Sequence, residues 1–312
     1  METDFIHELE NPKKKKIITL QMKNAYRQKE EAFKEELARI KDHIKKMEDE
    51  IKVSTDNYND YRQIAIANEH LAMVTLYINI TEDMETLKGV KHESYLNEGR
   101  KAFYNVLLSL EKVFTDFIPL EPTEIQKKAD SIPKFDPARK IILFRKIIFI
   151  LNNLEKGFGE KSKYRWAFAD MFVRFAIIFK NAMNIKDLTT RDPRKPFFEE
   201  NEILTNMLFD VLSRSSDKLR EKYEISTKKV IDMSNALKIL EELRRYFVLF
   251  KETASAEETK KKIDVWEDKL QKDMKTNEKL SLGVKKEEKK QRLSLDETMK
   301  KAQEALRKKG KK

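Results

Sequence analysis

Asp170 and Arg174 are the charged residues best placed to form a buried site, because they lie four apart in the strongly apolar stretch from Tyr164 to Met183. In a helix this spacing puts both side chains on one face. Charges in apolar surroundings are costly unless they are paired, and such groups often have shifted pKa values. We favour a structural ion pair here, with a helical enzyme or ligand-binding bundle as the remote alternative. Further partners expected from the neighbouring helix are Arg145, Asn152 and Asn153.

Other patterns that could support catalysis are weak in this sequence. The four histidines form none of the Glu-x-x-His pairs that a two-metal helical bundle uses. The segment from Gly157 to Ser162 lacks the spacing of a phosphate-binding loop, so we interpret it as a turn. The chain has no cysteine, which excludes disulfides, thiolate metal sites and cysteine nucleophiles. We therefore expect no catalytic residue, no cofactor and no metal, and a protein that is not an enzyme.

Positive charge is concentrated at the C-terminal end of the chain. The formal net charge is +11, and residues 279–312 contribute +8 of it, with 13 Lys and Arg against 5 Asp and Glu. The rest of the chain is therefore close to neutral. A nearly neutral body with a cationic tail favours a binding function over a chemical one.

The basic tail divides into two parts. Its first part, as far as residue 293, is too polar to bury a core, and we expect it to be flexible. Residues 294–297 match a helix capping box, and the apolar residues that follow are spaced as in a short amphipathic helix. The tail residues predicted to bind a partner are Lys285, Lys286, Lys289, Lys290, Arg292, Leu295, Met299, Leu306, Arg307 and Lys308.

Three kinds of partner suit such a tail. An acidic groove of a protein would use both the apolar stripe and the cations, as would an anionic membrane surface. A nucleic acid would use the lysines alone, without sequence specificity. A solubilising extension without any partner is the fourth interpretation, and among the partners we favour a protein.

The elements that position these groups are expected to be helices. Gly and Pro number only 6 and 7 in 312 residues, so few positions allow the turns that sheets need. We predict an all-α fold: an irregular bundle of long antiparallel helices, a long heptad-patterned N-terminal helix and a basic, partly disordered C-terminal tail. The predicted parts are a polar arm (1–16), the N-terminal helix (17–56), the bundle (57–253, with a sub-boundary in the linker 119–137), a charged exit helix (254–280) and the tail (281–312).

Turn and capping residues set the helix boundaries within the bundle. Gly89 is expected to end one helix, Asp136-Pro137 to begin another, and Ser226 and Ser255 to cap the last two. Helices over 138–156 and 164–183 are apolar on nearly every side, so we expect them in the core. A tetratricopeptide repeat is disfavoured, because aligning Gly99 with its small-residue position places Glu111 where a small alanine is required.

A heptad stripe runs along the N-terminal helix. Its apolar residues alternate at spacings of four and three, the pattern of a coiled coil. The stripe can pack on the body of its own chain or on a partner helix, including a second copy in a homodimer. The residues predicted to bind a partner there are Phe33, Leu37, Ile40, Ile44, Met47 and Ile51.

The sequence contains no segment expected to cross a membrane. Its longest apolar run, Ile141 to Leu151, is interrupted by Arg145-Lys146 and is far shorter than the roughly 20 residues required. The start of the chain lacks the form of a signal peptide. We therefore expect a cytoplasmic protein, a non-catalytic scaffold or adaptor that binds partner proteins through the heptad helix and the tail. The alternative is a protein associated with nucleic acid or an anionic surface through its lysines.

Overall fold

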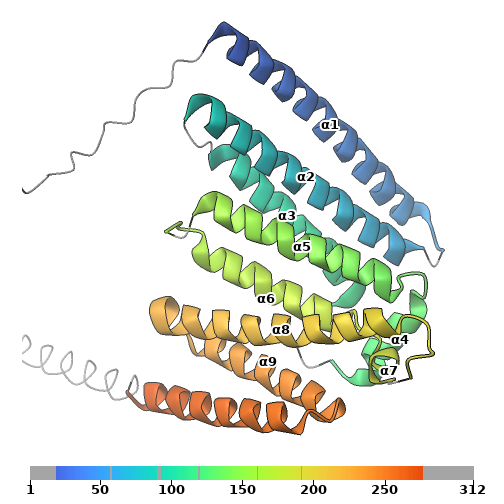
Figure 1. Ribbon diagram of the computed structural model, residues 1–312, viewed down its shortest axis with the longest axis vertical. Helices are drawn as coiled ribbons and strands as arrows, with labels where there is room; N and C mark the ends of the chain where they lie inside the picture. The colour runs from blue at the N-terminus through green and yellow to red at the C-terminus, as the bar shows by residue number, and fades with distance from the viewer. Residues whose placement is uncertain are drawn as a thin grey trace, which may run out of the picture. The chain divides into compact units, whose positions relative to one another are not determined.

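The computed structural model describes residues 19–56, 58–89, 93–118, 120–159, 161–190 and 192–276. These residues form helices joined by short connections, with no strand among them, which confirms the predicted all-α fold (Figure 1). The polar arm and the basic tail lie outside the described residues. The chain divides into two compact units, one ending at Leu219 and the other beginning at Arg220.

The first unit begins with two long helices, α1 (Leu20–Val53) and α2 (Asn59–Lys88). The hydroxyl of Thr19 accepts a hydrogen bond from the Met22 amide at 3.2 Å, which satisfies one of the free amides at the start of α1. α2 ends at Gly89, which has a φ of 66° and donates its amide to the Glu85 carbonyl. The predicted C-terminal cap is therefore confirmed.

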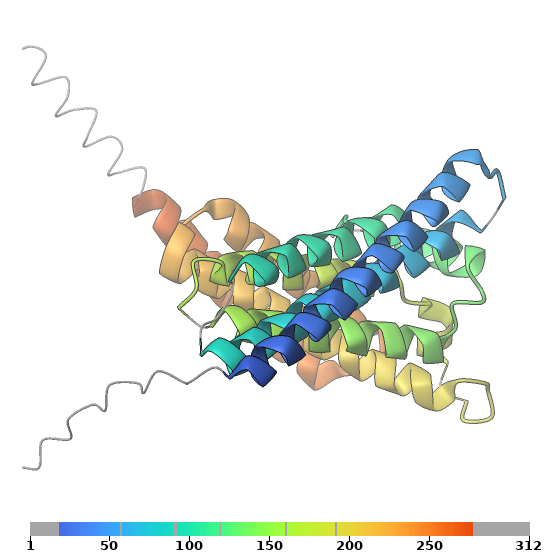
Figure 2. The ribbon, with the colours of Figure 1, turned by 90° about the horizontal axis from the view of Figure 1, so that it is seen from above.

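Two helical hairpins stack on each other in this unit. The first pairs α2 with α3 (Glu93–Phe114), and the second pairs α5 (Pro137–Phe158) with α6 (Arg165–Asn181). α2 also contacts α5, and α3 contacts both α5 and α6. α2 and α5 thus lie side by side, with α3 behind them (Figures 1 and 2). The short helices α4 (Pro122–Ser131) and α7 (Ile185–Thr189) pack on each other.

Gly99 explains how closely the two hairpins approach. A Cβ atom at this position would lie 3.3 Å from both Leu154 Cδ1 and Tyr77 Cβ. The absence of a side chain therefore lets α3 pack tightly against α2 and α5 at the same level.

The core of the first unit is rich in phenylalanine. Phe144 of α5 lies with its ring centroid 4.7 Å from that of Phe179 and 6.0 Å from that of Phe175, both on α6. All three side chains are fully buried, as the sequence predicts for these two helices. α5 begins as predicted at Asp136, whose carboxylate accepts a hydrogen bond from the Arg139 amide at 2.9 Å.

α8 (Phe198–Lys222) carries the chain from the first unit into the second. It continues as a π-helical turn, η1 (Tyr223–Thr227), and α9 (Val230–Leu249) and a helix over residues 253–276 follow. The prediction that Ser226 caps α9 is wrong, because this residue lies inside η1. Ser255 is likewise no cap: it lies within the last helix, and its carbonyl accepts a hydrogen bond from the Thr259 hydroxyl.

Candidate functional site

The outward surface shared by α2 and α5 is the feature of the first unit that differs most from the sequence expectation. α5 is apolar on almost every side, yet the structure buries it on one side only. Ile142 and Phe149 are 68% and 67% exposed, although both are large apolar residues. They lie seven residues apart, two helical turns along the same face of α5. We call this surface the α2–α5 face; its exposed residues include Ala65, Asn68 and Asn79 of α2 and Ile142, Arg145, Phe149 and Asn152 of α5.

Packing determines the direction of this face. α2 and α5 both contact α3, so the sides of these helices that point away from α3 lie on a common surface (Figures 1 and 2). The Lys146 ammonium of α5 donates a hydrogen bond to Asn68 Oδ1 of α2 at 2.7 Å, which fixes the register of the two helices. Ala65 and Asn68 are therefore close in level to Ile142 and Lys146.

The α2–α5 face is cationic along α5. Arg139, Arg145 and Lys156 are exposed there, whereas Glu155 is the only acidic residue between Pro137 and Phe158. Lys146 is half-buried, and its pKa is lowered by this burial, an effect that the carboxylate of Glu69 opposes. Two exposed apolar side chains are thus flanked by positive charge.

The predicted site around Asp170 and Arg174 has a different partner from those expected. Arg174 donates two hydrogen bonds to the carboxylate of Glu111 on α3, at 2.7 and 2.6 Å. Asp170 also has an interaction partner of its own. Arg145 and Asn152, expected beside Arg174, are exposed on the α2–α5 face instead.

Aromatic side chains continue this contact along α3 and α6. The guanidinium of Arg174 lies 5.8 Å from the ring centroid of Tyr104, and that of Arg100 lies 5.9 Å from it. Arg100 also lies 4.5 Å from the ring centroid of Tyr164. These polar groups hold α3 to α6, which supports the structural interpretation of Arg174 over a ligand site.

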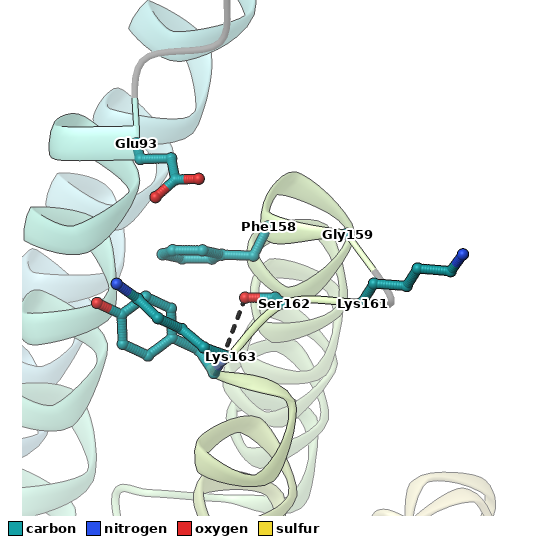
Figure 3. A pocket seen from close by; sticks show the side chains of 7 residues that line it. Glu93, Phe158, Gly159, Lys161, Ser162 and Lys163 are labelled. Atoms are coloured by element: carbon teal, nitrogen blue, oxygen red, sulfur yellow. Dashed lines mark hydrogen bonds between the residues drawn. The ribbon is translucent and has the colours of Figure 1, made fainter.

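A hollow opens at the turn between α5 and α6, in the segment interpreted from the sequence as a turn (Figure 3). Phe158 lies against Tyr164 with a centroid distance of 5.1 Å, and the Ser162 hydroxyl accepts a hydrogen bond from the Tyr164 amide. Lys161 points away from the other lining residues in Figure 3. The aromatic and hydroxyl groups that line the hollow thus stabilise the turn. Lys163 and Glu93 also line the hollow.

The heptad stripe of α1 is used within the chain. Phe33 contacts the rings of Tyr77 on α2 and Tyr95 on α3, with centroid distances of 5.6 and 5.5 Å. Ion pairs flank the stripe, from Lys29 to Asp83 at 2.5 Å and from His43 to Glu69 at 3.2 Å. Of the six stripe residues, Phe33, Ile40, Ile44 and Met47 are buried, and Leu37 and Ile51 are half-buried.

This packing is the first of the two arrangements expected from the sequence, in which the stripe packs on the body of its own chain. Because α1 packs on α2 of the same chain, a second helix would have to displace α2 to reach these side chains. Binding of the stripe to a partner helix, including a second copy of the chain, stays a prediction.

The tail residues predicted to bind a partner lie outside the described residues, so those assignments remain predictions. Within the described part of the chain, no three His, Asp or Glu side chains cluster in a way that could hold a metal ion. Every helix in that part is too short or too polar to span a bilayer.

Stacked helical hairpins with an exposed apolar and cationic face define the first unit. The chain belongs to the TP0443 family, which matches residues 22–274. The match covers α1 through nearly all of the last described helix and ends before the basic tail. No curated protein and no solved structure matches the chain.

Proposed function

We propose that this protein is a non-catalytic scaffold or adaptor that binds an acidic, amphipathic segment of a partner protein on the α2–α5 face. One observation carries the proposal: Ile142 and Phe149 are both about two-thirds exposed on one face of α5, with Arg145 exposed between them. The family match supports placing the function in the helical body, since it covers both helices of this face.

The residue types on the face suit protein recognition. Aromatic residues and Arg are enriched among the side chains that contribute most to protein interfaces, and apolar anchors there are surrounded by polar groups. Covering Ile142 and Phe149 would remove apolar surface from water, which is favourable by about 25 cal/mol per Å². The cations of α5 would attract acidic residues of the partner and so set its orientation.

The proposal that the protein is not an enzyme rests on how its polar groups are used. Arg174 and Glu111 bind each other, and the hydroxyl of Ser162 closes a turn. We also propose a cytoplasmic location, which the cysteine-free sequence suits. In this role the tail would add long-range attraction to acidic partners without providing the specific contact.

Affinity purification from the native cell tests the proposal. The bait is the full-length protein, compared with the double variant Ile142→Ser, Phe149→Ser. A matched control is Val248→Ser, Val265→Ser, which changes two other apolar residues that are 60% and 63% exposed. We expect the α2–α5 variant to lose its main protein partner, and the control to keep it.

A third bait, ending at residue 276, separates the face from the tail. Retention of the partner by this truncated chain is expected if the face provides the specific contact. If the α2–α5 variant recovers the same partners as the wild type, or if truncation alone removes them, the proposed role of this face is wrong.

A further inference from the structure

The π-helical turn at the start of the second unit holds an exposed apolar group in a fixed position. Tyr223 is 1% exposed, and its hydroxyl donates a hydrogen bond to Asp273 at 2.8 Å. Lys228 ends the turn with a φ of 51°, and the Thr227 hydroxyl donates to Asp232 at 2.6 Å. π-Helical turns are rare and are found frequently at functional sites.

Three exposed aliphatic residues lie in this turn and at the start of α9. Ile225 is 64% exposed, Ile231 56% and Val230 42%. We call these three residues, with Lys228 and Lys229, the η1 tip. Three large aliphatic side chains are thus exposed within seven residues, where the chain turns from α8 into α9.

Around the η1 tip, the acidic groups are paired within the unit and the lysines are exposed. The acidic groups have internal partners: Asp232 pairs with Lys222 at 3.4 Å, Asp273 with Lys269 at 2.7 Å, and Glu224 with Arg220 at 2.9 Å. Lys228 and Lys229 are exposed, and Lys228 lies 5.7 Å from the ring centroid of Tyr223. The outward charge of the tip is therefore positive.

The end of the last described helix adds to the same surface. The hydrogen bond between Tyr223 and Asp273 brings this end beside η1, and Figure 1 shows both at one end of the second unit. Lys272, Met274 and Lys275 are exposed there. The sequence that follows, residues 279–312, contributes a further net charge of +8.

We propose that the η1 tip docks on an anionic lipid bilayer. The side chains of Ile225, Val230 and Ile231 enter the headgroup and upper acyl region, and the lysines contact lipid phosphates. Apolar insertion and electrostatic attraction are each weak alone and together give stable peripheral binding. This inference goes beyond the proposed function, because it concerns the second unit and a lipid surface.

Charge and residue type favour lipid over the other anionic partners. Nucleic acid would use the lysines and leave the three aliphatic residues in water. The tip has no exposed aromatic or Arg anchor of the kind that dominates protein interfaces. A bilayer uses both the aliphatic side chains and the cations.

Vesicle sedimentation with the full-length protein tests the proposal. One set of vesicles contains two parts phosphatidylcholine to one part phosphatidylglycerol, and the other contains phosphatidylcholine alone. We expect the wild type to bind the anionic vesicles only. The double variant Ile225→Asp, Ile231→Asp should bind them at least about tenfold more weakly than the wild type. The control Val248→Asp, Val265→Asp places the same charges on side chains of similar exposure outside the tip, and it should bind like the wild type.

Insertion itself can be measured at a single position, because the chain has no cysteine. A polarity-sensitive fluorophore on Ile225→Cys should shift to the blue on anionic vesicles, whereas the same label on Val248→Cys should not. Failure of the wild type to bind anionic vesicles overturns the proposal, as does an unshifted label at position 225. Equal binding by the tip and control variants, with loss only on removing residues 279–312, would show that the tail binds lipid without the tip.

Discussion

Arg174 on α6 binds Glu111 on α3 through two parallel hydrogen bonds, from Nε to Oε1 at 2.7 Å and from Nη2 to Oε2 at 2.6 Å. The Glu111 side chain is 13% exposed and that of Arg174 is 31% exposed. The hydrogen bond to Glu111 raises the pKa of Arg174 above its usual value. This pair links the two stacked hairpins, and it occupies the position at which a tetratricopeptide repeat would need a small alanine.

Replacement of Glu111 tests how much this pair contributes. Glu111→Gln removes the negative charge and leaves a partly buried guanidinium, so we expect a loss of about 1 to 3 kcal/mol in the free energy of unfolding. Chemical denaturation measures this directly. Asp42→Asn is the control, because the Asp42–Lys46 pair is largely exposed and its loss should have little effect on stability.

A double variant separates the charge from the contact area. Glu111→Leu with Arg174→Leu should recover part of the stability lost in Glu111→Leu alone, because no unpaired charge remains. If Glu111→Gln loses no more stability than Asp42→Asn does, the role assigned to the Arg174–Glu111 pair is wrong.

The sequence predicted those features of the fold that depend on neighbouring residues. Asp136-Pro137 begins α5 through a capping carboxylate, and Gly89 ends α2 with a left-handed backbone conformation. Both helix boundaries depend on local residues, and both predictions are confirmed. The prediction that Ser226 caps α9 was wrong, because this residue lies inside η1. The Tyr223 hydroxyl of that turn donates a hydrogen bond to Asp273, 50 residues away in the chain. A tertiary hydrogen bond of this kind leaves no local signal.

The candidate site was missed because the apolar residues of α5 outnumber its polar ones. Arg139, Arg145, Asn152 and Lys156 recur on one side of the helix, a local signal that this side is exposed, but we expected α5 in the core because its other sides are apolar. The contacts of α5 with α2, α3 and α6 decide that Ile142 and Phe149 face solvent. Likewise, the partner of Arg174 lies 63 residues earlier in the chain, on a helix that becomes its neighbour only through stacking.

Truncation of Ile40 tests the packing of the heptad stripe on α2. Ile40 is 2% exposed, so Ile40→Ala should lower the free energy of unfolding by about 2 to 4 kcal/mol. The loss should be the same at low and high protein concentration, because the contact is within one chain. Leu20→Ala, at a 74% exposed position of α1, is the control and should have little effect. A concentration-dependent loss would instead indicate that the stripe joins two chains.

Lys140 should lower stability at neutral pH. Its side chain is 4% exposed, and burial lowers its pKa to about 8, although Asp187 and Asp136 oppose this shift. At pH 7 the amine is charged in both states, so the folded state carries the desolvation cost. We expect Lys140→Met to raise the free energy of unfolding by up to about 3 kcal/mol.

The pH dependence of this effect has a definite sign. Between pH 8 and the usual lysine value of 10.5, the unfolded chain binds more protons at this residue than the folded chain. The wild type should therefore gain stability relative to Lys140→Met as the pH rises through this interval. A difference that stays constant with pH would contradict the lowered pKa.

His70 should make the fold sensitive to mild acid. Burial lowers its pKa to about 4, and the nearby positive charge of Lys112 adds to this effect. Its Nδ1 atom is buried without a hydrogen-bond partner. Between pH 6.5 and 4 the unfolded chain gains a proton at this residue while the folded chain stays neutral there, so stability falls as the pH is lowered through this window. The loss should amount to about 2 to 3 kcal/mol by pH 4.

Comparison with His70→Gln isolates this contribution from the other acidic and basic groups. Glutamine does not titrate, so the difference in unfolding free energy between wild type and variant should be level above pH 6.5 and should change steadily down to pH 4, to the disadvantage of the wild type. His43→Gln is the matched control, since His43 is largely exposed and pairs with Glu69. If the difference between wild type and His70→Gln is level across the whole range, His70 is protonated in the folded chain, and the packing of α2 around it must admit water.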